Sequence, residues 1–190
     1  MIIKSAKDMT RYSGLKIEAS YNLEKKCLIL LEKNYECICG LKCNHFPVIK
    51  SFDDKEYTFT LSNNGYTLPD YRRKRYAKKI KRIIIKNKKN QIDCIIQNMK
   101  KSKVKHYDLH HNGKNVCINE QGVISIIDFD IAVINDNPLT KEIEWSHRWE
   151  GRGKNEWKKS KFKQSLNKNI YYERIKWKIN DQLRKICGIL

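Results

Sequence analysis

The chain has 190 residues, which is the size of one domain. Apolar residues make up 40% of it and there are only eight Gly and three Pro, so a disordered or fibrous chain is excluded. The formal net charge of +19 at pH 7 suggests an anionic partner.

The first 65 residues predict one helix and one β-hairpin. A helix over 21–34 is indicated by an apolar stripe of Leu23, Cys27, Leu30 and Leu31. Two runs rich in strand-forming residues, Val48–Phe52 and Tyr57–Leu61, predict the hairpin. Ser62–Gly65 then interrupts the pattern, and we expect a hinge there.

The loop at 35–45, between this helix and the hairpin, contains four metal-ligand side chains. They are Cys37, Cys39, Cys43 and His45. Zn²⁺ binds such residues in tetrahedral geometry, although this spacing is tighter than that of paired C-x2-C knuckles. Two interpretations stay open, a Zn²⁺ site and a cysteine-rich loop with reduced thiols.

The rest of the chain predicts more helix than strand. A basic helix over much of 71–90 would bury Tyr76, Ile80, Ile83 and Ile84, and the clearest helical repeat is Ile92, Ile95, Ile96 and Met99. Val116–Ile118 and Val123–Ile127 predict a second hairpin. From about residue 139 the composition is helical, with a stripe of Ile175, Ile179, Leu183 and Ile186.

Two segments, 71–105 and 152–185, hold most of the positive charge. The first has 15 basic residues and one acidic residue, a net charge of +14, and the second has 12 basic and three acidic residues, a net charge of +9. The rest of the chain has a net charge of −4. Aromatic residues among Lys and Arg are typical of surfaces on which bases stack, but amphipathic helices with lysine stems over apolar surface give the same pattern. The segments are candidates for binding nucleic acid or an acidic protein partner.

The longest apolar runs are too short for a signal peptide or a membrane span. Lys4 follows the first three residues at once, and Cys27–Leu31 is far below the roughly 20 residues of a transmembrane helix. Seven cysteines without a secretion signal predict reduced thiols, a cytoplasmic location and no membrane association.

The segment 106–130 combines a polar loop, a hairpin and a carboxylate after a buried strand. In order, it contains His106, Asp108, Leu109, Asn115, Asp128 and Phe129. Phosphoryl transfer needs one carboxylate to orient the attacking hydroxyl, and an amide and another carboxylate to hold Mg²⁺. The segment resembles the H-x-D-L-x-x-x-N and D-F-G motifs of the protein-kinase superfamily.

This resemblance implies ATP and Mg²⁺ as cofactors and assigns roles to the loop residues. Asp108 would orient or deprotonate the acceptor hydroxyl, and Lys114 would contact the γ-phosphate. Asn115 and Asp128 would hold Mg²⁺. We assign Asn115 rather than Asn112 because Val-Cys-Ile follows it, as in the family's strand. His106 would hold the loop in place rather than carry a proton.

The resemblance extends toward the start of the chain. The first four residues are similar to the V-A-I-K strand, so Lys4 would form an ion pair with Glu24 and steady the α- and β-phosphates. Thr58–Gly65 looks like the fifth strand and hinge of the family, where Leu61 and Asn63 would lie beside the adenine.

The sequence also departs from the family pattern. Asn115 follows Asp108 by seven positions instead of five, and Tyr107 replaces the Arg that pairs with a phosphorylated activation loop. His110 and Asp130 resemble residues of aminoglycoside and choline kinase-like enzymes, and no A-P-E element follows. There is also no G-x-G-x-x-G.

The resulting prediction is an α+β, two-lobed protein kinase-like fold in a single domain, 1–190. It has a truncated N-lobe (1–62), a hinge (63–65) and a mainly helical C-lobe (66–190). The predicted function is ATP-dependent phosphotransfer, by an atypical protein Ser/Thr kinase. The alternatives are a small-molecule kinase of the aminoglycoside or choline kinase-like type, and a catalytically impaired pseudokinase or basic nucleic-acid-binding scaffold.

Overall fold

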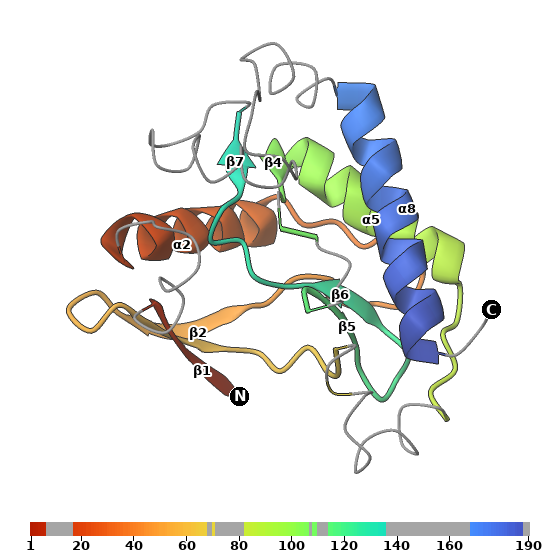
Figure 1. The fold of residues 1–190 in the computed structure, drawn as a ribbon, viewed down its shortest axis with the longest axis horizontal. Coiled ribbons are helices and arrows are strands. Elements are labelled where there is room, and N and C mark those ends of the chain that lie inside the picture. The colour runs from red at the N-terminus through yellow and green to blue at the C-terminus, as the bar shows by residue number, and fades with distance from the viewer. Residues whose placement is uncertain are drawn as a thin grey trace, which may run out of the picture.

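The computed structural model has a mixed α+β architecture, as the sequence predicts (Figure 1). It describes residues 1–6, 17–67, 70, 82–106, 108–109, 114–135 and 168–187. The helices within these ranges are α2 (Ile17–Lys33), α5 (Lys88–Lys101) and α8 (Lys168–Cys187).

A three-stranded antiparallel sheet is formed by residues from the first third of the chain. Its strand order is β1-β3-β2, with β1 at Ile2–Ser5, β2 at Ile49–Asp53 and β3 at Thr58–Leu61. The hairpin predicted here is confirmed, since β2 and β3 pair directly. Asp53 stabilises its turn, because its Oδ1 accepts the N–H groups of Lys55 and Glu56.

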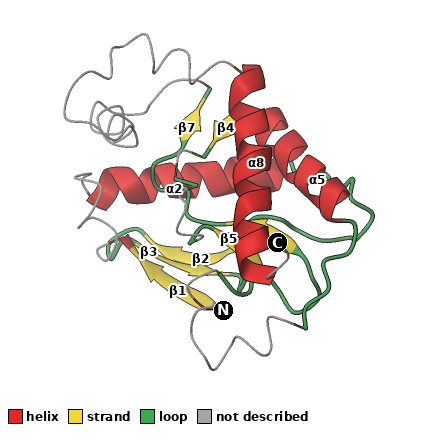
Figure 2. Ribbon diagram, turned by 45° about the vertical axis from the view of Figure 1, so that its right-hand side comes forward, coloured by secondary structure: helices red, strands yellow, loops and turns green. Residues whose placement is uncertain are grey.

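Helix α2 packs against this sheet and begins four residues before the predicted start. The ring of Tyr21 stacks on that of Phe59 with 4.5 Å between centroids. In Figure 2 the helix runs beside the strands of the sheet. One face of the sheet is thereby covered, and the side chains on that face lie between the strands and α2.

Short paired strands and two helices make up the remainder of the described chain. The second predicted hairpin is confirmed as β5 (Val116–Ile118) and β6 (Ile124–Ile126). Strands β4 (Val104–Lys105) and β7 (Val133–Ile134) also pair. Helices α5 and α8 lie side by side in Figures 1 and 2, with Nζ of Lys100 5.0 Å from the ring centroid of Tyr172.

The prediction of a helix over much of 71–90 is wrong for the residues that precede α5. Residues 71–81 lie outside the described residues, and 82–87 form no helix. Ile83 and Ile85 pack against the core, whereas Ile84 is 75% exposed instead of buried. This alternation is that of an extended chain. Its path crosses Gly122, where an added Cβ would lie 2.1 Å from the Ile84 carbonyl oxygen.

The predicted helical tail is described only over α8, and 139–167 lie outside the described residues. The stripe of Ile175, Ile179 and Leu183 is buried as predicted. Among the described helices, none is both long and apolar enough to cross a membrane.

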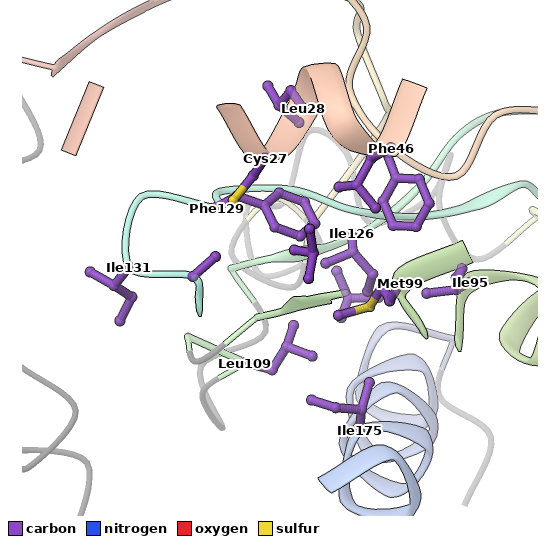
Figure 3. Close-up of a cluster of buried hydrophobic side chains, with 14 of the residues drawn as sticks. Cys27, Leu28, Phe46, Ile95, Met99, Leu109, Ile126, Phe129, Ile131 and Ile175 are labelled. Carbon is purple, nitrogen blue, oxygen red and sulfur yellow. The ribbon is translucent and has the colours of Figure 1, made fainter. Parts of the chain in front are cut away.

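One continuous hydrophobic core joins the sheet, the helices and the short strands. Figure 3 shows Phe129 near Cys27 of α2 and Phe46, with Met99 of α5 and Ile175 of α8 in the same cluster. The Phe129 ring lies 6.0 Å from that of Phe46 and 4.7 Å from that of His106, between centroids. Burial of Phe129 thus anchors the chain beside Asp128, at the edge of the candidate site.

Candidate functional site

Lys4 of β1 joins two carboxylates from distant parts of the chain. Its Nζ lies 2.7 Å from both carboxylate oxygens of Glu24 on α2, and 2.5 Å from Oδ1 of Asp128. Lys4 reaches them because it is paired with Phe59, so its side chain points to the covered face of the sheet. The structure therefore brings together three of the residues predicted to serve the nucleotide and the metal.

The Lys4–Glu24 pair is largely removed from solvent. Glu24 is fully buried, and the side chain of Lys4 is 21% exposed. Burial raises the pKa of Glu24, and the nearby ammonium of Lys4 partly offsets this effect. Burial by itself lowers the pKa of Lys4, but the negative charges of Glu24 and Asp128 have the larger combined effect and raise the pKa above its ordinary value. Lys4 therefore stays protonated.

The loop that carries Asp108 is held by hydrogen bonds on two sides. The amide of Asn115 donates to the Asp108 carbonyl at 2.6 Å and to its Oδ2 at 2.9 Å. The buried His106 accepts the Asp108 N–H at Nδ1 (3.1 Å), so Nε2 carries the proton and donates to the Ile127 carbonyl (2.8 Å). Burial lowers the pKa of His106, which favours a neutral imidazole that ties the loop to the strand leading to Asp128.

Three carboxylates, Asp108, Asp128 and Asp130, converge so that one oxygen of each lies within 4.8 Å of the others. Asp128 has a φ of 72°, a left-handed conformation that is found preferentially at functional sites. Asp130 is 8% exposed, and its Oδ1 has no hydrogen-bond partner. Burial, and then the charge of Asp128, raise the pKa of Asp130 well above its ordinary value.

This convergence is unfavourable for carboxylates alone and favourable around a divalent cation. Buried like charges repel one another, and an unpaired buried oxygen costs free energy. Mg²⁺ binds carboxylate oxygens and neutralises their charge. The unpaired oxygen of Asp130 and the half-buried carboxylate of Asp128 therefore fit a Mg²⁺ site, with the carboxylate of Asp108 beside it.

Replacing Asp130 with Asn should stabilise the metal-free protein and weaken its response to Mg²⁺. Loss of the buried charge beside Asp128 removes repulsion, so we expect the free energy of unfolding to rise by about 1 kcal/mol. Thermal unfolding with and without millimolar Mg²⁺ measures both effects. The control is Asp93→Asn on α5, where the carboxylate pairs with Lys176 at 2.9 Å near the surface. A less stable Asp130→Asn variant with an unchanged Mg²⁺ response would contradict this interpretation.

The structure also describes the remaining predicted site residues. Leu61 is buried at the end of β3 and faces the same side as Phe59, the strand partner of Lys4. Asn63 is exposed, and its Oδ1 accepts the N–H of Gly65 at 2.9 Å. Lys114 is exposed next to Asn115 and makes no ion pair with the residues that the structure describes.

The connection after Asn63 is fastened to β5. Tyr66 and Ile118 exchange two backbone hydrogen bonds, of 2.8 and 2.9 Å. Gly65 permits this approach, because a Cβ added at this position would lie 2.3 Å from the Ile118 carbonyl oxygen. The φ of Gly65 is also +102°, which glycine adopts readily and other residues rarely do.

The predicted zinc ligands Cys37, Cys39, Cys43 and His45 also come together, and the three thiols form a candidate metal cluster. Cys94 of α5 lies in a second group with Cys39 and His45. Although burial opposes ionisation, hydrogen bonds from Cys43 and Cys39 lower the pKa of Cys37 to about 7. A thiolate is thus accessible at this loop near neutral pH.

Sequence reasoning missed two members of these clusters. Asp130 departs from D-F-G, and its position two residues after Asp128 is the signal that could have indicated a third metal ligand. Cys94 stands on the buried face of α5, 49 positions after His45 by their residue numbers, and no local motif connects it to the loop.

The basic segments are described only in part. Of the aromatic residues proposed to stack on bases, Tyr172 is 4% exposed and packs within the core, whereas Trp177 is 58% exposed. Lys105 is 2% exposed and so contributes nothing to an exposed basic surface. Tyr107, His110 and His111, together with 71–81 and 152–167, lie outside the described residues.

No protein-family model matches this sequence, and no curated protein matches it significantly.

Proposed function

We propose that the chain is an ATP-dependent phosphotransferase with a protein kinase-like fold, which transfers the γ-phosphate of ATP to a hydroxyl group. One observation carries the proposal. Three convergent carboxylates, one with an unpaired buried oxygen, lie beside a buried lysine–glutamate ion pair. Phosphoryl transfer depends on such a combination of metal ligands and fixed positive charge, because its transition state is stabilised mainly by positioning and electrostatics.

Each residue of the cluster has a role in this reaction. Asp128 and Asp130 would hold Mg²⁺ together with Asn115, and the metal would neutralise charge on the phosphates. Asp108, steadied by the Asn115 amide, would orient or deprotonate the acceptor hydroxyl. Lys4 would contact the α- and β-phosphates while Glu24 keeps its ammonium in place.

The acceptor we propose first is a Ser or Thr side chain of a protein, in keeping with the general resemblance to protein kinases. A hydroxylated small molecule is the second candidate, and the buried Asp130 favours it, since aspartate at this position resembles aminoglycoside and choline kinase-like enzymes. Transfer of labelled phosphate to protein acceptors and to a panel of hydroxylated metabolites separates the two. We place the protein in the cytoplasm, in keeping with the free thiols of its described cysteines.

Thermal unfolding in the presence of Mg-ATP tests the nucleotide site itself. Mg-ATP at 100 times its dissociation constant should stabilise the protein by about 2.7 kcal/mol, since it binds only the folded state. ATP without Mg²⁺ should stabilise it less, and Asp128→Asn should lose most of the effect. Asp93→Asn on α5 is the matched control and should respond like the parent protein.

The absence of any shift at millimolar Mg-ATP would overturn the phosphotransferase proposal. A shift caused by RNA or DNA instead, with an affinity that falls steeply as salt rises, would favour a nucleic-acid-binding scaffold.

A further inference from the structure

We propose that Cys37, Cys39, Cys43 and His45 bind one structural Zn²⁺ ion, apart from the phosphotransferase site. The four residues lie in the loop between α2 and β2. The ion would cross-link this loop internally.

Ligand atoms that follow one another along the loop are spaced nearly as in a tetrahedral zinc centre. The Sγ atoms of Cys37 and Cys39 are 3.5 Å apart, and those of Cys39 and Cys43 are 3.4 Å apart. The Sγ of Cys43 lies 3.5 Å from Nε2 of His45. Zinc bonds of about 2.3 Å to sulfur and 2.0–2.1 Å to nitrogen place tetrahedral ligand atoms about 3.6–3.8 Å apart. Small outward movements of the side chains would therefore admit the ion.

His45 is oriented as a zinc ligand by a second hydrogen bond. It is fully buried, and its Nδ1 lies 2.6 Å from the Ile124 carbonyl oxygen. A carbonyl can only accept, so Nδ1 carries the proton and Nε2 keeps its lone pair on the side of Cys43. Histidine ligands of metals usually donate their other ring N–H to a carbonyl or a carboxylate in this way.

Cys94 is the neighbouring thiol that we assign to the surroundings of the ion rather than to its ligands. Its Sγ lies 3.7 Å from the Glu36 carbonyl, to which the thiol donates. It also accepts the Ile38 N–H and an amide N–H of Asn98, both at 3.5 Å. These bonds satisfy the buried thiol and fix the start of the loop against α5.

The position of the loop explains why an internal cross-link would matter. The His45 carbonyl accepts the Ile126 N–H at 2.9 Å, so His45 holds β6 both by its ring and by its backbone. Asp128 follows Ile126 by two residues. A zinc ion on His45 would thus stiffen the strand that leads to the carboxylate cluster. With four protein ligands its coordination is complete, which is typical of structural zinc.

Zinc binding to this site would release protons and would involve no oxidation or reduction. The three thiols lose their protons to solvent as they bind, His45 binds as neutral imidazole, and no electron is transferred. The site therefore requires reduced cysteines.

Metal analysis of the full chain, purified under reducing conditions, tests the proposal. We expect about one zinc per chain, and less than roughly a tenth of that in the double variant Cys39→Ser/Cys43→Ser. Cys94→Ser and Cys117→Ser, which alter buried thiols outside the ligand set, should keep the ion. Wild-type protein freed of zinc and loaded with Co²⁺ gives a second readout that requires no variant. It should show the thiolate-to-cobalt charge-transfer band and the ligand-field bands of a tetrahedral site.

Two results would overturn the proposal: wild-type protein that holds no zinc and gives no Co²⁺ charge-transfer band, or a Cys37–Cys39 disulfide in the freshly purified chain. Loss of zinc from Cys94→Ser with retention in Cys37→Ser would overturn the ligand set. Each readout is independent of ATP, so failure of the phosphotransferase proposal leaves this test intact.

Discussion

Replacing Asp108 with alanine should lower the rate of phosphoryl transfer by about 10²–10⁴-fold, the usual contribution of a positioned acid or base. The loss is expected because Asp108 is fixed by two bonds from the Asn115 amide and one to His106, next to the carboxylates that would hold Mg²⁺. Labelled phosphate from ATP, transferred to the protein itself or to a generic acceptor, measures the rate.

The Asp108→Ala variant should still bind nucleotide, which separates its role from that of a structural residue. Lys4, Glu24 and Asp128 remain in place, so Mg-ATP should raise the melting temperature as it does in the parent protein. The control Asp93→Asn removes a carboxylate from a surface ion pair and should leave the rate unchanged. Full phosphoryl transfer by Asp108→Ala would refute its catalytic role.

Hydrophobic periodicity within a short stretch of sequence predicted those helices and strands whose buried residues all come from that stretch. Both hairpins and the helices α2 and α5 follow from alternation or from 3.6-residue periodicity. The proximity of Lys4 to Glu24 was accessible only through the resemblance to kinases, because nothing local connects residues 20 positions apart on a strand and a helix.

Tertiary contacts decided the features that the sequence could not predict. Ile84 belongs to an apolar triplet that fits a helix, yet the chain is extended where it crosses Gly122 and this side chain faces solvent. Lys105 belongs to a basic segment, yet it is buried where β4 pairs with β7. Whether the buried oxygen of Asp130 finds a hydrogen-bond partner depends on the groups that the fold places around it, and no local sequence pattern predicts those groups.

Lys4 and Glu24 should be strongly coupled in stability. Lys4→Met leaves the fully buried Glu24 without its partner, so we expect the free energy of unfolding to fall by about 3–5 kcal/mol. The double variant Lys4→Met/Glu24→Leu should recover most of this loss, because an apolar pair of similar volume replaces a buried ion pair at little cost. Denaturant unfolding of the parent, both single variants and the double variant gives the coupling free energy.

The same variants distinguish a structural ion pair from one that serves the nucleotide. If Lys4 contacts the phosphates, the double variant should recover stability but not its stabilisation by Mg-ATP, since the ammonium is absent. A matched pair of changes at Lys25 and Asp54, whose ion pair of 2.7 Å involves an exposed carboxylate, should alter neither property much. Undiminished stabilisation of the double variant by Mg-ATP would show that the pair serves the fold alone, and Lys4 would then have no role at the phosphates.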